Sequence, residues 1–340
     1  MTNAKLPVLV TGGAGYIGSH AVLALLDAGW PVSVIDDLST GFRFAVPEDV
    51  PFYEGDIEDT DLLMRIFAEQ GIGAIMHFAG SIIVPESVEN PLKYYHNNTA
   101  KSRTLIGAAV AAGVSHFIFS STAAAYGIPD TSPIREDSPK APINPYGMSK
   151  LMTETMLADV ARAHPFNAGV LRYFNVAGAD PAARTGQSTA GATHLIKVAV
   201  EAALGKRSHV SVFGTDFDTP DGTGVRDYIH VSDLAAAHVL TLEALIADPT
   251  RSRTMNCGYG RGFSVLEVLD AVDQVTGKTL ERRLEGRRAG DPDSLISDTG
   301  LIRSTLSWTP RHDDLATIVT HALAWERRLS DLRDRPAVAA

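Results

Sequence analysis

The stretch Thr11-Gly-Gly-Ala-Gly-Tyr-Ile-Gly18 decides the fold. It follows a short apolar run at residues 8–10 and opens a stretch with helical spacing at 17–28. Its glycines have the spacing G-x-x-G-x-x-G and stand at Gly12, Gly15 and Gly18. Such glycines allow a tight turn, close approach of the backbone to a pyrophosphate and close packing of helix on strand. Because a helix N-terminus also offers free N–H groups to phosphates, the stretch predicts a dinucleotide-binding turn.

The first half of the chain alternates short apolar runs with longer helical patterns. Strands are expected at residues 8–10, 32–35, 52–53, 74–78, 117–120 and 169–173. Helices are expected at residues 17–28, 61–69, 92–112 and 146–163. Near-continuous apolar strands separated by helices predict a parallel sheet covered on both faces. The expected fold is therefore a doubly wound α/β (Rossmann) sheet, with ligands at the carboxyl ends of its strands.

A smaller α/β substrate domain is expected after about Phe174, where the alternation ends. Further elements are expected at 193–204, 210–213, 231–247, 254–257, 265–275 and 315–329, the last one capped by Asp314. We expect residues 1–176 to form the cofactor domain and 225–257 to rejoin it. Residues 177–224 and 258–340 then form the smaller domain, and the active site lies in the cleft between the two.

Composition and charge limit the possible functions. The chain has 340 residues and a formal net charge of -10, which argues against a general nucleic-acid binder because counterion release needs clustered basic residues. Cys257 is the only cysteine, so an internal disulfide is impossible and a reducing compartment is expected. Residues 6–11 predict a strand and not a signal peptide, and Lys197 and Glu201 interrupt the longest apolar run. We expect a soluble cytoplasmic protein with no membrane segment, no nucleic-acid partner and no metal.

Acidic residues at strand ends indicate which cofactor binds. Asp36 closes the second strand, where a carboxylate accepts from ribose hydroxyls and repels a 2′-phosphate, so NAD is favoured over NADP. Asp37 is the neighbouring alternative, or a turn residue. Asp56 could contact adenine or, equally, cap a helix. The expected cofactor-binding set is Gly12, Gly15, Tyr16, Ile17, Gly18, Asp36, Asp37, Asp56, Ile57, Phe78, Ala79 and Gly80.

The stretch Tyr146-Gly-Met-Ser-Lys150 places a phenol and an ammonium on one helix face. A free tyrosine has a pKa near 10, and a fixed cation beside it, with the positive ring of an oxidised nicotinamide, favours the phenolate. Ser120-Ser121-Thr122 ends the fifth strand, so the Thr122 hydroxyl is expected in the same crevice, where it could relay a proton to Tyr146. An isolated Tyr-x-x-x-Lys is usually a surface pair, but behind a dinucleotide fold it predicts alcohol oxidation chemistry.

These motifs together resemble the extended short-chain dehydrogenase/reductases, and within them the UDP-sugar 4-epimerases. The resemblance extends from Val10 to the last helix. Its motifs are the glycine turn, Ser-Ser-Thr122, Tyr146-x-x-x-Lys150, Arg172-Tyr-Phe-Asn175, Asp221-Gly-Thr-Gly-Val-Arg-Asp-Tyr-Ile-His-Val231, Arg288-x-x-Asp291 and Leu306-x-Trp308-x-Pro310. It implies an NAD-dependent enzyme that interconverts UDP-glucose and UDP-galactose through a 4-keto sugar with hydride return. It also implies a homodimer formed by the helices at 92–112 and 146–163.

The same resemblance implies roles for single residues. Thr122 and Tyr146 would touch the sugar 4-hydroxyl, and Lys150 would tune Tyr146 and hold the nicotinamide ribose. Asn97 would lie near the cofactor and Phe174 beside the nicotinamide. The UDP part would be held by Asn175, His194, Leu195, Phe213, Arg226, Arg288 and Asp291. Leu295 would limit the room beside the sugar, unless it only packs in the small domain.

Departures from the family pattern separate the remaining alternatives. Ile82 stands where family members often have a lysine that contacts the cofactor, and Thr193-His194 replaces an Asn-Asn pair. Ala123 and Ala124 stand where 4,6-dehydratases have an Asp-Glu pair, which weakens a dehydratase interpretation. A 4-epimerase for another UDP-sugar, a net nucleotide-sugar oxidoreductase and a silent NAD-binding protein remain as alternatives.

Overall fold

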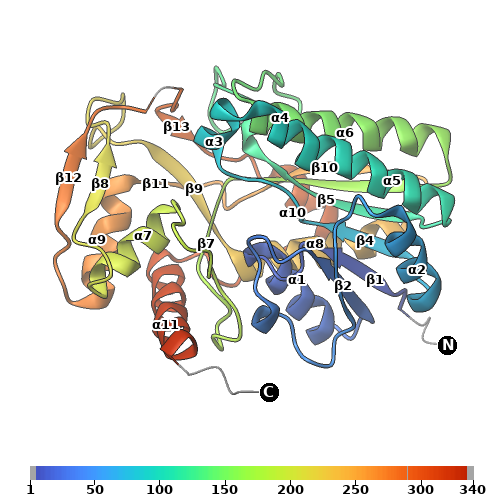
Figure 1. The fold of residues 1–340 in the computed structure, drawn as a ribbon. Coiled ribbons are helices and arrows are strands. Elements are labelled where there is room, and N and C mark those ends of the chain that lie inside the picture. The colour runs from blue at the N-terminus through green and yellow to red at the C-terminus, as the bar shows by residue number, and fades with distance from the viewer. Residues whose placement is uncertain (1–4, 289, 335–340) are drawn as a thin grey trace.

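A parallel seven-stranded sheet forms the centre of the larger part of the molecule (Figure 1). The computed structural model describes residues 5–288 and 290–334. The strand order is β10-β6-β5-β4-β1-β2-β3. The strands are β1 (Val8–Thr11), β2 (Val32–Asp36), β3 (Phe52–Glu54), β4 (Ala74–His77), β5 (His116–Thr122), β6 (Asn167–Tyr173) and β10 (Arg253–Cys257). The predicted doubly wound fold is confirmed, and the order reverses between β1 and β4, the place where such sheets bind ligands.

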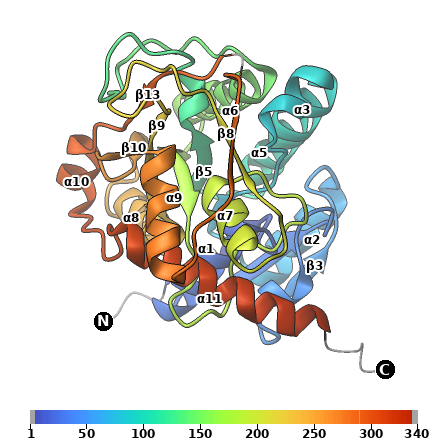
Figure 2. The ribbon, with the colours of Figure 1, turned by 90° about the vertical axis from the view of Figure 1, so that its left-hand side faces the viewer.

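Two apolar layers cover the two faces of this sheet. The valines of β1, Val8 and Val10, pack with α1 and α8 on one face, whereas Leu9 packs with α2, α5 and α6 on the other. Figures 1 and 2 show these helices on opposite sides of the strands. The helices are α1 (Tyr16–Asp27), α2 (Thr60–Gln70), α5 (Lys101–Ala111), α6 (Pro145–Ala163) and α8 (Val231–Ala247). Every position of β1, β2 and β4 is buried, and most positions of these three strands are apolar.

The helix predicted at 92–112 is not one regular α-helix. It consists of α4 (Pro91–Tyr94), a π-helical segment η2 (Tyr95–Ala100) and α5. A π-helical turn accommodates an extra residue, which a hydrophobic pattern with a 3.6-residue period does not reveal. The short helix α3 (Val84–Glu89) precedes α4 and was not expected. Two 3₁₀ turns complete this part, η1 (Arg43–Ala45) and η3 (Ala123–Ala125).

The smaller part contains two short sheets and the helices that pack beside them. One sheet joins β7 (Asn175–Ala177), β9 (Val225–His230), β11 (Gly262–Ser264) and β13 (Ser294–Leu295), and the other joins β8 (Val210–Phe213) to β12 (Arg282–Glu285). The helices are α7 (Leu195–Ala203), α9 (Val265–Thr276) and α11 (Leu315–Asp334). The helix α10 (Gly300–Leu306) packs instead against β10 and α8 of the larger part. A large apolar cluster packs α7, α9 and α11 together and includes Ile196, Leu269 and Ile318.

Residues 225–257 divide between the two parts. β10 pairs in parallel with β6 of the large sheet, but β9 lies in the small sheet between β11 and β13. The strand expected at 254–257 thus joins the large sheet as β10, and α8 packs on that sheet, whereas β9 belongs to the small sheet. Asp314 accepts a hydrogen bond from the Thr317 amide at 2.8 Å, which confirms it as the cap of α11. In the described ranges, every helix is too short or too polar to cross a membrane.

Candidate active site

The glycine-rich turn connects β1 to α1 at the carboxyl end of the sheet. Gly12 has a φ of +68°, in the left-handed region that favours glycine. A Cβ on Gly12 would lie 2.6 Å from the Ala79 nitrogen, and one on Gly18 would lie 2.1 Å from the Gly12 oxygen. Gly15 is the N-cap of α1 and supplies no side-chain cap to the first N–H groups. The turn thus offers both the close approach and the donors that a pyrophosphate needs.

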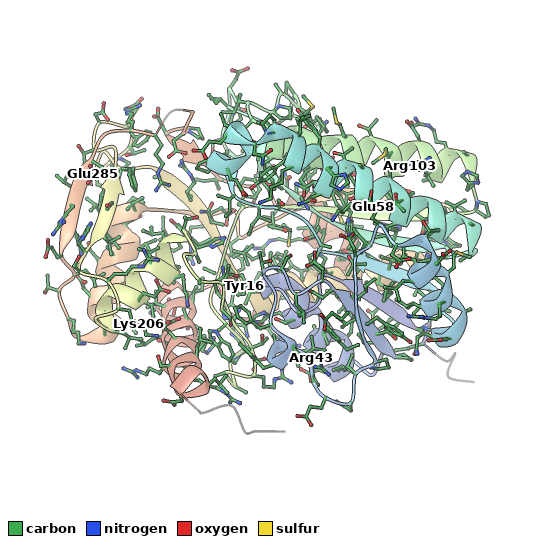
Figure 3. All side chains as sticks on the ribbon, viewed as in Figure 1. Tyr16, Arg43, Glu58, Arg103, Lys206 and Glu285 are labelled. Atoms are coloured by element: carbon green, nitrogen blue, oxygen red, sulfur yellow. The ribbon has the colours of Figure 1, made fainter. Side chains whose placement is uncertain are left out.

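Tyr16 and Ile17 lie where α1 meets the smaller part of the molecule. Figure 3 shows Tyr16 near the middle of the molecule, and its hydroxyl donates to the Gly178 carbonyl at 2.7 Å. Both side chains pack against the apolar cluster of the smaller part. Tyr16 and Ile17 therefore hold the glycine-rich turn against the smaller part of the molecule.

Asp36 faces the glycine-rich turn, whereas Asp37 forms a local turn. The Asp36 carboxylate accepts from the amides of Ala14 and Leu38, each at 2.9 Å. Burial raises the pKa of Asp36, and these two hydrogen bonds oppose that rise. Asp37 accepts from the Ser39 amide at 2.9 Å and from its hydroxyl at 2.6 Å. Asp36 is thus the one of the two that lies against the turn.

Asp56 does not cap the following helix. The amide of Leu62 in α2 donates to Asp59 at 2.9 Å, so Asp59 is the cap. Asp56 accepts from the Glu58 amide at 2.9 Å and forms an ion pair with Lys101. The capping alternative for Asp56 was therefore wrong. The neighbouring Ile57 is buried.

The end of β4 faces the π-helical segment. After Phe78 and Ala79, Gly80 has a φ of +153°, and a Cβ there would lie 2.8 Å from Asn98 Oδ1. Asn98 accepts from the Ser81 amide at 2.7 Å and donates to Ser149 Oγ at 3.0 Å. Asn97 donates to Ser81 Oγ at 3.0 Å. The π-helical turn therefore directs both asparagines toward the segment after β4.

Thr122, Tyr146 and Lys150 lie together, all three buried. Asn144 caps α6 by accepting from the Gly147 amide at 2.9 Å, which fixes the first turn of the helix that contains Tyr146. Lys150 Nζ donates to the Ser120 carbonyl at 3.1 Å and lies 4.8 Å from the Phe119 ring centroid. The structure thus brings the end of β5 and the first turns of α6 into one site.

The electrostatics of this group are dominated by burial. Burial raises the pKa of Tyr146, and a hydrogen bond with Thr122 lowers it in part. Burial lowers the pKa of Lys150 to about 8, against the raising effect of the Glu154 charge. In the protein without cofactor, the neighbour that lowers the pKa of Tyr146 is therefore Thr122. Lys150, which was predicted to have this effect, is not the main cause.

A second group of polar and aromatic side chains comes from the smaller part. The Arg288 guanidinium lies 3.7 Å from the ring centroid of Phe213, at the end of β8. Arg226 lies on β9, and its Nη2 is 3.8 Å from Asp291 Oδ1. Such loosely paired arginines retain donors for a diphosphate.

Five further predicted residues lie on or next to the elements beside these arginines. Asn175 opens β7, which pairs with β9. His194 is the residue before α7, and burial lowers its pKa, while Leu195 begins that helix. Phe174 and Leu295 both pack against Ala123, Tyr126 and Ile134, just beyond Thr122. The predicted sugar-side residues are thus near the catalytic group. The predicted UDP-side residues lie on β7, β8 and β9 and at the start of α7, with Arg288 and Asp291 in the segment after β12.

The comparisons with known proteins agree with this geometry. Residues 8–258 match the model of the NAD dependent epimerase/dehydratase family. The chain belongs to that family. It is 58% identical to a UDP-glucose 4-epimerase of Azospirillum brasilense over 96% of this chain and 94% of that protein.

Solved structures show the same similarity. A UDP-glucose 4-epimerase from Stenotrophomonas maltophila, with bound NAD and formylated UDP-arabinopyranose, has a TM-score of 0.93 and 39% identity, over 96% of this chain and 99% of that one. The UDP-Glc/GlcNAc 4-epimerase of Campylobacter jejuni has a TM-score of 0.83 and 47% identity, over 95% and 99%.

Sequence reasoning on this epimerase/dehydratase family member missed three buried polar residues. Asn98 supports the segment after β4, Tyr94 donates to the Ile83 carbonyl at 2.6 Å, and Glu154 pairs with Arg172. Glu154 has a sequence signal, because it lies one helical turn beyond Lys150 on the same face. Asn98 has only its adjacency to Asn97, and Tyr94 has none. Ile82, at the position without the expected lysine, is 53% exposed.

Proposed function

We propose that this protein is an NAD-dependent UDP-glucose 4-epimerase that interconverts UDP-glucose and UDP-galactose through a transient 4-keto sugar. The observation that supports this most strongly is the burial of Thr122, Tyr146 and Lys150 together at the carboxyl end of β5, next to Gly80 at the end of β4. Relatives named UDP-glucose 4-epimerase extend over nearly the whole chain, and their identity supports the same activity.

The residues around the turn fit NAD. The uncapped start of α1 and the glycines would take the pyrophosphate, and Asp36 would accept from the adenosine ribose. Gly80 and Asn97 would line the path to the nicotinamide, with Phe174 beside it. The chemistry that NAD supplies when bound is reversible hydride removal from C4 of the sugar, with no net oxidation.

Tyr146 would hold and move the proton of the sugar 4-hydroxyl. Its burial excludes water, and Thr122 would share the hydrogen bond to the same hydroxyl. Lys150 would keep a positive charge beside the site, since Glu154 opposes the effect of burial on its pKa. The positive charge of an oxidised nicotinamide would add to that effect.

The nucleotide part would be held away from the reacting carbon. Arg226 and Arg288 would neutralise the diphosphate, Phe213 would stack, and the remaining contacts would come from Asn175, His194, Leu195 and Asp291. Firm binding of UDP and loose binding of the sugar would let the 4-keto sugar rotate in the pocket and present its other face to the cofactor. Such binding requires two domains with a cleft between them. We assign residues 1–176, with α8 and β10, to the cofactor domain and the smaller part to the substrate domain.

A homodimer in the cytoplasm completes the proposal. A surface groove of about 580 Å³ is lined by residues of η2, α5 and α6, among them Tyr95, Met152 and Met156, and by Glu58 and Arg103. Figure 3 labels Glu58 and Arg103, which lie beside these helices. Leu92 on α4 is 78% exposed. A second copy would cover these apolar groups. A monomeric mass at micromolar concentration with full activity would contradict the dimer.

The cytoplasm is favoured as the location of this protein because Cys257 is a free thiol.

The activity can be tested on the purified protein without added cofactor. UDP-galactose should be converted to UDP-glucose to equilibrium, because the cofactor is regenerated in each cycle. A net oxidoreductase would instead need stoichiometric cofactor and would leave an oxidised or reduced sugar, and that outcome would overturn the proposal. A silent NAD-binding protein would give no product.

A further inference from the structure

A buried carboxylate joins three elements behind the catalytic group. Glu154 on α6 accepts from Arg172 Nε at 3.0 Å and from Arg172 Nη2 at 2.5 Å. Ser121 Oγ donates to the same carboxylate at 2.5 Å. The Arg172 and Glu154 side chains are only 5% and 7% exposed. One ion pair thus connects α6 to β5 and β6 in the interior.

The connection continues without a break into the smaller part. Arg172 Nη1 donates to the Tyr126 hydroxyl at 2.9 Å, and Tyr126 donates to Asn256 Oδ1 at 2.7 Å. Asn256 Nδ2 donates to the Ile134 carbonyl at 2.8 Å. The Ile134 amide donates to the carbonyl of Ile296, the residue directly after β13, at 2.8 Å.

Several members of this network adjoin functional residues in the chain without occupying the site themselves. Ser121 precedes Thr122 in β5, and Tyr126 follows the 3₁₀ turn that begins after Thr122. Glu154 lies one turn after Lys150 on α6, and its charge raises the pKa of Lys150. The side chains of the network therefore support the catalytic residues through their neighbours in the chain.

We propose that Glu154, Arg172, Tyr126 and Asn256 are positioning residues that fix Thr122 and Lys150 relative to each other and to β13. This inference rests on the proposed epimerase function. A buried ion pair is a poor stabiliser, because an apolar pair of similar volume is often as stable. Its presence behind the site is explained if a displacement of about 1 Å in the catalytic group costs about 10²-fold in rate.

A double variant separates positioning from stability. Glu154→Met with Arg172→Met removes both charges, leaves no unpaired buried ion and keeps unbranched side chains of similar length. We expect it to fold, to retain NAD and to keep KM for UDP-galactose within about twofold, while kcat falls by roughly 10–100-fold. A folded double variant with the wild-type kcat would overturn the proposal.

Tyr126→Phe tests the same network with a smaller change. It removes one hydroxyl and leaves the ring 4.9 Å from the Arg172 guanidinium carbon. We expect kcat to fall by roughly tenfold with KM and NAD content unchanged. The matched control is Tyr259→Phe, since the Tyr259 hydroxyl is also bonded inside the protein, to Asp233 at 2.6 Å, but in the apolar cluster of the smaller part. The control should lose some stability and keep kcat.

The outcomes distinguish the network from the function on which it rests. If wild type converts UDP-galactose and Tyr126→Phe has the same kcat, the network proposal fails alone, even if the double variant does not fold. A loss of kcat in Tyr259→Phe equal to that in Tyr126→Phe would show a general effect of stability and would also overturn the proposal. If wild type converts nothing, the proposed function fails first.

Discussion

Leu295 on β13 pairs in parallel register with Arg226 on β9. The same leucine packs against Ala123 and Tyr126, immediately beyond Thr122. One residue therefore lies between the arginine proposed to bind the diphosphate and the threonine proposed to contact the sugar.

This placement predicts that Leu295 controls sugar selectivity. Leu295→Ser would remove bulk beside the sugar, so kcat/KM for UDP-N-acetylgalactosamine should rise relative to that for UDP-galactose, because selectivity is a difference between two fits. Steady-state kinetics with both sugars measures the ratio. An unchanged ratio in a folded Leu295→Ser variant would show that this leucine only packs in the small domain.

Tyr146→Phe should lose about 10²–10⁴-fold in kcat, the usual size of a general acid/base contribution. Thr122→Val should be impaired less, since Thr122 only assists the same proton transfer. The control is Tyr53→Phe, whose hydroxyl bonds Glu69 at 3.0 Å on the protein surface and should not affect turnover. Epimerisation by Tyr146→Phe at nearly the wild-type rate would remove Tyr146 from the mechanism.

Asp36→Ala should lower the NAD content of the purified protein, because its carboxylate lies against the glycine-rich turn. Asp37→Ala is the matched control, as Asp37 only accepts from Ser39 in a local turn. Release of NAD by denaturation, followed by its quantification, compares the two variants. Equal NAD content in both would exclude Asp36 as the ribose-binding residue.

Buried histidines predict a loss of stability at acid pH. Burial lowers the pKa of His20 and of His238 to about 4. It lowers the pKa of His77 to about 3. In the unfolded chain these groups have a pKa near 6.5, so the unfolded state binds more protons as pH falls below that value. Their contribution to stability is therefore full above about pH 6.5 and is lost as pH falls toward the folded pKa of each.

The expected loss is about 1.4 kcal/mol per pH unit for each histidine well below pH 6. Urea unfolding at pH 7.5, 6 and 5 measures it. His238→Leu should reduce this slope of stability against pH by the contribution of one histidine. Stability independent of pH from 7.5 to 5 would contradict the prediction.

Periodicity was enough to predict the large sheet, because the strands at its centre, such as β1, β2 and β4, are buried throughout and are short, mostly apolar runs. It was not enough for η2, since a π-helical turn leaves no mark in a 3.6-residue pattern. β12 was missed because Arg282, Arg283 and Glu285 make it polar, and β9 because its residues belong to a motif considered only for ligand binding.

The sequence predicted some residues of the candidate site and missed others. The glycine turn and Tyr146-x-x-x-Lys150 have fixed spacings along the chain, so the sequence alone places them. Glu154 and Arg172 are 18 residues apart and meet only because α6 packs on β6. Contacts of that kind depend on tertiary structure, and the sequence could identify Arg172 only as part of a family motif.

The mechanism is tested most directly with UDP-galactose that has deuterium at C4. If the hydrogen removed from C4 returns within the same active site, UDP-glucose should form in ordinary water with the deuterium retained at C4. Tyr146→Phe should form the same labelled product more slowly. Loss of the deuterium to solvent at a rate equal to epimerisation would mean direct deprotonation of C4 and would contradict the hydride-return mechanism.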